Sequence, residues 1–155
     1  MAPSTTAQFR TAVDADIPIL LDLYAQLLDN KPSGSVKETG MPQWAREALL
    51  GFKGSHSRLY VLEDEGKVVG TLVLVLVPGL AHGGRPWAEV EHVVITDTVR
   101  GKGYGKLLME HAERLAKAAN CYKLQLMSSN YRTAAHGFYE GIGYKQVAKG
   151  FRKYF

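Results

Sequence analysis

The residues best suited to do chemistry in this sequence form a glycine-rich basic turn, Arg100-Gly101-Lys102-Gly103-Tyr104-Gly105-Lys106. A β-branched run, Val93-Val94-Ile95, precedes the turn, and a helical pattern begins at Lys106. Glycine lets the backbone take positive φ and lets a ligand approach the main chain closely. The first amides of a helix have no internal partner and attract anions, and cationic side chains add charge here. The pattern predicts a cradle for a phosphate or pyrophosphate group.

The strand that leads into the turn carries two acidic side chains and a histidine, Glu89, Glu91 and His92. In a regular strand, Glu91 lies on the same face as Val93 and Ile95, which end next to the turn. A carboxylate there could act as a general base toward a group bound at the turn. Glu91 is our first candidate for that base. Glu89 and His92 are alternative candidates for the base. The alternative without a catalytic role is that the two acids simply lie on a solvated or hydrogen-bonded face of the sheet.

Several common sites are excluded by spacing. The sequence contains no G-x-x-x-x-G-K-[ST] phosphate loop, and its alternating glycines do not fit the dinucleotide pattern G-x-G-x-x-G. It contains no G-x-S-x-G elbow, and no His, Cys and carboxylate set has metal-ligand spacing, so we expect no metal. Cys121 is the only cysteine, which excludes a disulfide framework and a multi-cysteine zinc site.

Length and composition are those of one globular domain. The 155 residues are 46% hydrophobic and 22% charged, with a formal net charge of +4. The mild positive charge suits an anionic cofactor, and without a basic stripe it does not indicate a nucleic-acid partner. The amino terminus lacks a signal-peptide pattern, and the apolar run Val68–Val77 is far shorter than the ~20 residues of a membrane span. We therefore expect a single cytoplasmic domain with no membrane partner.

Hydrophobic periodicity predicts the elements that position these residues. The predicted strands cover residues 8–13, 57–64, 67–77, 87–95, 122–127, 144–148 and 151–155. The predicted helices lie near residues 17–28, 42–52, 106–119 and 134–140. The second helix should bury an apolar side that includes Trp44, and Cys121 should be a buried, inert thiol.

Three segments resemble the GCN5-related N-acetyltransferase family. The turn matches Arg-x-x-Gly-x-Gly and there resembles the family's motif A, whose loop holds the pyrophosphate of acetyl-coenzyme A (acetyl-CoA). Residues 135–144 resemble motif B, with Tyr144 in place of a final Phe, and residues 90–95 resemble the family's fourth strand. The resemblance covers nearly the whole chain and is sharpest over residues 87–144. It implies an α/β (α+β) single-domain fold, with a mixed, mostly antiparallel sheet of six to seven strands and about four helices on both sides.

The resemblance also implies acetyl-CoA as cosubstrate, an acceptor-side half over residues 1–86 and an acetyl-CoA-binding core over residues 87–144. In this role Glu91 is the candidate base, and Tyr139 is the candidate acid that protonates the leaving thiolate. The cofactor-binding residues that it implies are Val93, Val94, Ile95, Arg100, Gly101, Lys102, Gly103, Tyr104, Gly105, Lys106, Asn130 and Tyr139.

The acceptor is expected to be a small-molecule primary amine, such as an amino sugar, a polyamine or a drug-like amine. The carboxyl half is similar to glucosamine-6-phosphate acetyltransferases, and Arg132, Arg152 and Lys153 could bind a phosphate or could be solubilising residues. A protein lysine or amino-terminal acetyltransferase is the alternative enzyme. A non-catalytic acyl-CoA sensor is the alternative from another class, and a homodimer is compatible with the resemblance.

Overall fold

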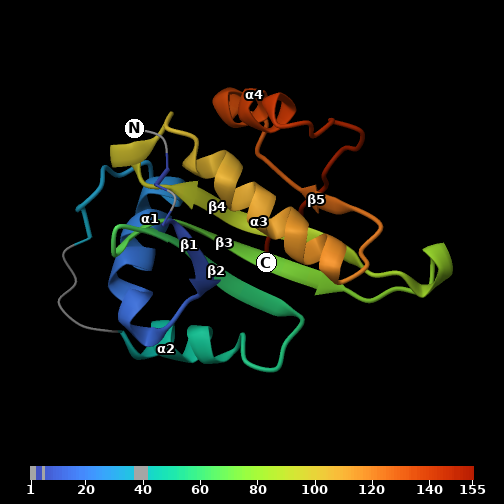
Figure 1. Cartoon of the computed structure of the whole chain (residues 1–155), viewed down its shortest axis with the longest axis horizontal. Coiled ribbons are helices and arrows are strands. Elements are labelled where there is room, and N and C mark those ends of the chain that lie inside the picture. The colour runs from blue at the N-terminus through green and yellow to red at the C-terminus, as the bar shows by residue number, and fades with distance from the viewer. Residues whose placement is uncertain (1–2, 5, 37–41) are drawn as a thin grey trace. The chain divides into compact units, whose positions relative to one another are not determined.

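The computed structural model describes residues 3–4, 6–36 and 42–155. The chain forms two compact units, divided between Gln125 and Leu126. The elements, labelled in Figure 1, are β1 (Gln8–Thr11), α1 (Ile17–Leu28), α2 (Gln43–Leu50), β2 (Ser57–Asp64), β3 (Lys67–Val77), β4 (Trp87–Ile95), α3 (Tyr104–Ala118), β5 (Leu124–Leu126) and α4 (Thr133–Gly141). Short 3₁₀ helices lie at Asp14–Asp16, His82–Gly84 and Asp97–Val99.

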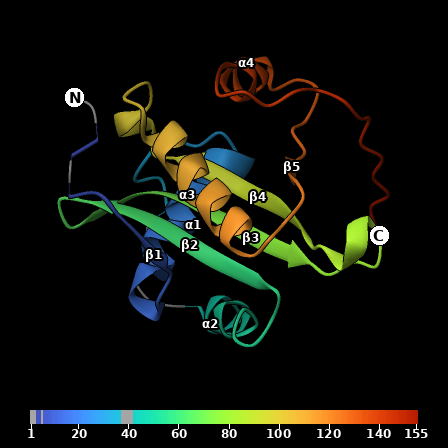
Figure 2. The same cartoon turned by 45° about the vertical axis from the view of Figure 1, so that its right-hand side comes forward.

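The strands form one sheet in the order β1-β2-β3-β4-β5, and each pair from β1 to β4 is antiparallel. In Figure 2, α3 lies over one face of the sheet and α1 lies on the other. β3 is central, and its residues 69–74 are all buried, since both faces of the sheet are covered by helices. The predicted α/β class, with helices on both sides of a mostly antiparallel sheet, is confirmed.

Each face of the sheet has its own apolar packing. On one face, Leu20 of α1 packs in a cluster with Leu59, Val61 and Val73. On the other face, α3 contributes its fully buried residues Leu108, Met109 and Ala112. Full burial of one such leucine or methionine contributes about 1.5–3 kcal/mol. Among the described residues, no helix has the length and apolar character to cross a membrane.

β4 contains a bulge that the sequence did not predict. The register of β4 on β3 shifts after Glu91, so that His92 and Val93 together lie opposite a single residue of β3. His92 takes a φ of 52°, a conformation that non-glycine residues seldom adopt. A bulge of this kind leaves an extra residue without a ladder partner and increases the local twist. The strand that enters the candidate cradle is therefore bent just before it ends.

The bulge also changes which side chains share a face. Glu91 lies opposite Val73, on the face that packs against α1. After the bulge, Val94 returns to that face, whereas Ile95 pairs with Gly70 on the other one. The predicted grouping of Glu91 with Ile95 on one face is therefore wrong, because the extra residue shifts the two-residue alternation by one position.

The sheet has five strands, not the predicted six to seven. Residues 144–148 and 151–155 were predicted as strands, but the structure gives them no strand conformation. Val147 is 85% exposed and Phe151 is 90% exposed, so both segments leave apolar side chains in solvent. Strand propensity becomes a strand only where a neighbouring strand and an apolar surface are in place.

Smaller differences concern the ends and faces of elements. α3 begins at Tyr104, two residues before the predicted start, and β5 covers only residues 124–126 of the predicted 122–127. Trp44 on α2 is 61% exposed, so the predicted apolar side of that helix is wrong at this residue. Cys121 precedes β5 and is half-buried, where burial raises the pKa of its thiol despite the nearby Arg85.

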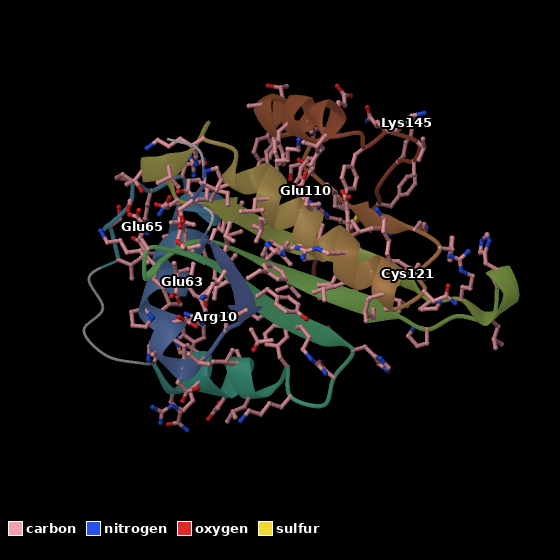
Figure 3. The ribbon with its side chains drawn as sticks, viewed as in Figure 1. Arg10, Glu63, Glu65, Glu110, Cys121 and Lys145 are labelled. Atoms are coloured by element: carbon pink, nitrogen blue, oxygen red, sulfur yellow. The ribbon has the colours of Figure 1, made fainter. Side chains whose placement is uncertain are left out.

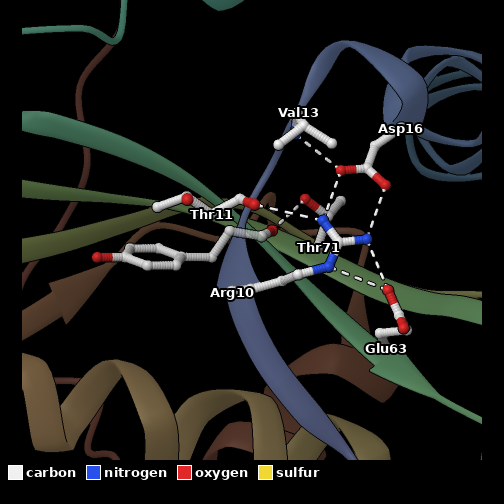
Figure 4. Close-up of polar contacts among 7 residues, drawn as sticks. Arg10, Thr11, Val13, Asp16, Glu63 and Thr71 are labelled. Atoms are coloured by element: carbon white, nitrogen blue, oxygen red, sulfur yellow. Dashed lines mark hydrogen bonds and ion pairs between the residues drawn. The ribbon is translucent and has the colours of Figure 1, made fainter. Parts of the chain in front are cut away.

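A cluster of charged side chains joins β1, β2 and the start of α1. The Arg10 guanidinium donates to both oxygens of Asp16, at 2.8 and 3.0 Å, and to Glu63 Oε2 at 2.6 Å (Figure 4). In Figure 3, Arg10 and Glu63 come from neighbouring strands at one end of the sheet. The backbone amide of Val13 also donates to Asp16, at 2.8 Å. This cluster fixes the turn that leads from β1 into α1.

Replacing the central cation of this cluster should destabilise the fold. Arg10→Met should lower the free energy of unfolding by about 1–3 kcal/mol at neutral pH, because it leaves the buried Asp16 carboxylate without its cation. Burial by itself would raise the pKa of Asp16, but the contacts with Arg10 and Val13 lower it below its usual value. A carboxyl whose pKa is lowered by folding stabilises the protein above its ordinary pKa, and that stabilisation is lost as the pH falls.

Urea unfolding of wild type and Arg10→Met across a pH series measures this effect. The two curves should approach each other below about pH 4, where Asp16 takes up its proton. Glu110→Gln is the control, since Glu110 lies 3.8 Å from Lys106 in an exposed pair that is worth at most about 0.5 kcal/mol. Equal stability of wild type and Arg10→Met at neutral pH would contradict the prediction.

Candidate active site

The turn between β4 and α3 depends on two glycines. Gly101 has a φ of 77° and Gly103 has a φ of 92°. A side chain is strained in this left-handed region, so both positions require glycine on conformational grounds. Gly103 is the N-cap of α3, and a Cβ there would also approach the ring of Pro3 at 3.5 Å. The backbone can therefore turn sharply into the helix and remain open to a ligand.

The amides of this turn are available to a ligand. The amide of Leu107 donates to the carbonyl of Gly103 over 3.1 Å, which begins the helical ladder of α3. Within the described part of the chain, no acceptor takes a hydrogen bond from the backbone amides of residues 101–106. The side chains of Arg100, Lys102 and Lys106 around them are exposed. Amides at the start of a 15-residue helix and three cations together form a site for an anion.

Three hydrogen bonds fix the position of the turn. The phenol of Tyr104 donates to Asp64 Oδ2 at 2.6 Å, and Arg100 Nε donates to the carbonyl of Ile95 at 3.1 Å. The backbone amide of Asp97 donates to Gln26 Oε1 at 2.9 Å. Tyr104 was predicted to bind cofactor, but its side chain is buried against Asp64, so only its backbone amide is available to a ligand.

The bulge in β4 lies within two residues of the predicted contacts Val94 and Ile95. Next to it, Tyr24 of α1 meets the ring of His92 edge-on, with centroids 5.6 Å apart. Burial raises the pKa of Tyr24, against the opposite effect of its hydrogen bond with Thr71. The pattern that predicted a helix over residues 17–28 gave no indication that Tyr24 would lie beside His92.

One sequence signal could have revealed this irregularity. Gly70 lies inside β3, opposite Ile95, and a Cβ there would overlap the Ile95 side chain and reach to 3.0 Å of the Val94 carbonyl. A glycine inside a strand marks a bulge or a close approach of another backbone. The glycine therefore permits β3 and the end of β4 to lie close together beside the bulge.

The two candidate carboxylates lie on the same face of β4. Glu89 pairs with Val75 and Glu91 pairs with Val73, both on the face that packs against α1. Burial raises the pKa of Glu89, and interaction with Glu91 raises it further, against the opposite effect of Gln125. Glu89 therefore keeps its proton to a higher pH than an ordinary glutamic acid.

Two other candidate residues belong to the second unit. Tyr139 is half-buried on α4, where its ring contacts those of Phe138 and Tyr144 at centroid distances of 5.0 and 6.0 Å. Asn130 is exposed in the turn before α4. The structure describes these residues within residues 126–155 only, and their roles at the cradle remain predictions.

The same turn gathers cationic side chains. Arg152 Nη1 lies 3.5 Å from Ser129 Oγ, and the Arg132 guanidinium lies 5.6 Å from the centre of the Tyr131 ring. Hydrogen bonds with Arg132 and Ser129, together with the charges of both arginines, lower the pKa of Tyr131. The local potential is therefore positive. The part of the chain that the structure covers contains no cluster of three or more His, Cys, Asp or Glu side chains arranged to hold a metal.

Comparison with known proteins identifies the family. Residues 21–144 match the model of the acetyltransferase (GNAT) family. The aminoalkylphosphonate N-acetyltransferase of Salmonella typhimurium is 34% identical over 94% of this chain and 90% of its own length. The glucosamine 6-phosphate N-acetyltransferase of Trypanosoma brucei brucei is 27% identical over 89% of this chain and 88% of its own.

A solved structure from Agrobacterium tumefaciens str. C58, assigned by its name to the acetyltransferases, superposes with a TM-score of 0.80. It is 35% identical and aligns over 96% of this chain and 99% of that one. The chain therefore belongs to the GNAT acetyltransferase family, and it is an acyltransferase of the N-acetyltransferase type.

The open turn should be sensitive to a side chain at its second glycine. Gly103→Val should abolish coenzyme A binding, because a β-branched residue at a φ of 92° is strained by about 1–3 kcal/mol and the amides must move. Gly66→Val is the matched control, since Gly66 has a φ of 73° in the turn between β2 and β3. Calorimetry should show coenzyme A binding to the control and none to Gly103→Val. Equal affinity in both variants would mean that this turn is not the site.

Proposed function

We propose that this protein is an acetyl-CoA-dependent N-acetyltransferase whose acceptor is a small primary amine that carries a phosphate or phosphonate group. The observation that carries the cofactor assignment is the run of amides at residues 101–106 that have no acceptor in the described chain. A diphosphate has the charge and the number of oxygens to accept several of them at once.

The residues of the turn fit such a cofactor. The amides of residues 101–106 would hold the diphosphate, with the charges of Arg100, Lys102 and Lys106 around it. The backbone of residues 93–95 at the end of β4 would receive the pantetheine arm, and Asn130 and Tyr139 would complete the contacts. When bound, the cofactor supplies an acetyl thioester.

The acceptor amine must lose a proton before it can attack. With a lysine-like pKa near 10.4, about one amine in a few thousand is neutral at pH 7, which costs about 4–5 kcal/mol. Glu91 is the proposed base, and it takes that proton directly or through a water molecule. Glu89 lies on the same face of β4, two residues before Glu91, and is the alternative base.

Two further groups of the chain act on the thioester itself. The backbone amide of Val93, at the bulge, is the proposed donor to the carbonyl oxygen as negative charge develops on it. The Tyr139 hydroxyl is the proposed donor to the leaving sulfur, since a phenol carries its proton at neutral pH. The amine proton thus goes to Glu91 and the Tyr139 proton goes to the thiolate, and the tyrosinate is reprotonated from solvent.

The acceptor class rests on the relatives and on the charge of the second unit. The two curated relatives are named for acetylation of glucosamine 6-phosphate and of aminoalkylphosphonates, both of which are amines with a phosphorus oxyanion. Within residues 126–155, Arg132 and Arg152 gather at the turn that contains Ser129. With Lys153, they are the proposed ligands of that oxyanion, since arginine binds such groups through paired hydrogen bonds.

Substitution of the proposed base and acid should have different signatures. Glu91→Gln should lower kcat at neutral pH by about 10²-fold, and the loss should shrink at alkaline pH as the free amine becomes abundant. Tyr139→Phe should lower kcat with little change in the affinity for acetyl-CoA. Steady-state rates across pH, with calorimetry of both variants, measure these effects. An unchanged pH profile would remove Glu91 as the base, and unchanged turnover would remove Tyr139 as the acid.

Release of free thiol from acetyl-CoA over a panel of amines tests the proposed function. Glucosamine 6-phosphate against glucosamine, and 2-aminoethylphosphonate against ethanolamine, are pairs that differ in the oxyanion. The oxyanion-bearing member should have a kcat/KM at least about tenfold higher, as expected for one charge-assisted hydrogen bond, and Arg152→Gln should reduce that preference. Turnover of a lysine peptide alone would indicate a protein acetyltransferase. Tight cofactor binding without turnover of any amine would indicate a sensor.

A further inference from the structure

Two polar side chains of α1, Asp22 and Gln26, are buried although neither belongs to the proposed site. Each is only 5% exposed. They lie four residues apart, so they are neighbours on one side of the helix. Gln26 Nε2 donates to Asp22 Oδ2 at 3.0 Å. Buried polar groups almost always have hydrogen-bond partners. In this pair, the remaining side-chain oxygens, Asp22 Oδ1 and Gln26 Oε1, bind two separate segments of the chain.

Asp22 holds the segment that follows α1. Its Oδ1 accepts from the backbone amide of Gly34 at 2.9 Å and from that of Val36 at 3.4 Å. The 33–36 segment lies in the half of the chain that was predicted to contact the acceptor. Its backbone therefore has its position fixed by one buried carboxylate.

Gln26 holds the loop that leads into the cradle. Its Oε1 accepts from the backbone amide of Asp97 at 2.9 Å, three residues before Arg100. The Asp97 carboxylate in turn accepts from the backbone amide of Ser33 at 3.0 Å. The amide group of Gln26 thus has a single workable orientation, with nitrogen toward Asp22 and oxygen toward Asp97.

Gln26 also borders a hollow beside this network. The space of about 260 Å³ is lined by residues 30–32, which come just before the 33–36 segment, and by Gln26, Asp97 and Arg100. The chain that leads into the 33–36 segment and the loop that leads into the cradle therefore meet at one hollow. The acceptor-side segment and the cofactor-side loop share one set of supports.

We infer that the Asp22–Gln26 pair couples cofactor binding at the cradle to the position of the 33–36 segment. The inference rests on the proposed function, because it takes coenzyme A as the ligand of the cradle. Both are positioning residues, since each acts through backbone amides of other segments. Coupling of this kind is reciprocal, so an ordered 33–36 segment also favours cofactor binding.

The chain offers a test in which the whole network is broken and then rebuilt. Asp22→Asn places an amide nitrogen against the nitrogen of Gln26, and Gln26→Glu places two carboxylates together. The double variant Asp22→Asn with Gln26→Glu restores every bond, because the new asparagine donates to the new glutamate and both keep their backbone acceptor roles. Net charge is the same in wild type and double variant. Leu62→Ala, at a fully buried residue of β2, is the control for general loss of stability.

Amide hydrogen exchange at Gly34 and Val36 is measured with and without saturating coenzyme A. The readout is the ratio of the two rates, because a general loss of stability speeds exchange in both conditions. Coenzyme A should slow this exchange at least about fivefold in wild type, the lower end of typical couplings, and also in Leu62→Ala. Each single variant should lose the effect, and the double variant should regain it.

Other outcomes overturn the inference. A wild-type response in the single variants, or no recovery in the double variant, would show that the pair does not carry the coupling. Coenzyme A binding without any change at Gly34 and Val36 would also overturn it and would leave the proposed function standing. Absence of coenzyme A binding to wild type would remove both.

Discussion

The structure depends on one constraint, which is that the amides at the start of α3 must stay without protein acceptors while the loop that carries them is held still. An unpaired amide costs free energy when it is buried, and an amide on a mobile loop has no fixed position for a ligand. The chain therefore exposes these amides and anchors the loop on each side of the glycines. Tyr104 binds Asp64 after the turn, and Asp97 is bound by Gln26 before it. Gly101 and Gly103 supply the conformations that side chains would resist.

β4 serves two purposes that a regular strand could not combine. Up to Glu91 it presents carboxylates to the α1 face, and after the bulge at His92 it delivers the backbone into the cradle. The acidic side chains of β4 and the basic turn that follows this strand are therefore close together along the chain. His92 can keep its positive φ because the paired strand on both sides of it fixes the backbone.

The sequence predicted most of the first unit because its signals are local. β2, β3 and β4 have the predicted bounds, since alternation and turn residues act over a few positions. The glycine-rich turn lies between β4 and α3 as predicted, because its signal lies in consecutive residues, although α3 begins two residues before the predicted start. The bulge escaped prediction because it depends on how β4 registers on β3. The carboxyl-terminal strands failed for a related reason, since a strand requires a partner that propensity alone does not provide.

The sequence by itself determined the fold class, the place of the glycine-rich turn and the candidate carboxylates, since each follows from residue type and short spacing. Tertiary structure decided which face those carboxylates occupy, that Tyr104 anchors the turn with its side chain, and that Asp22 and Gln26 of α1 support segments far from them in the chain. Such features arise from contacts between residues 12 to 71 positions apart. Their geometry is set by strand register and helix packing, which no local pattern encodes.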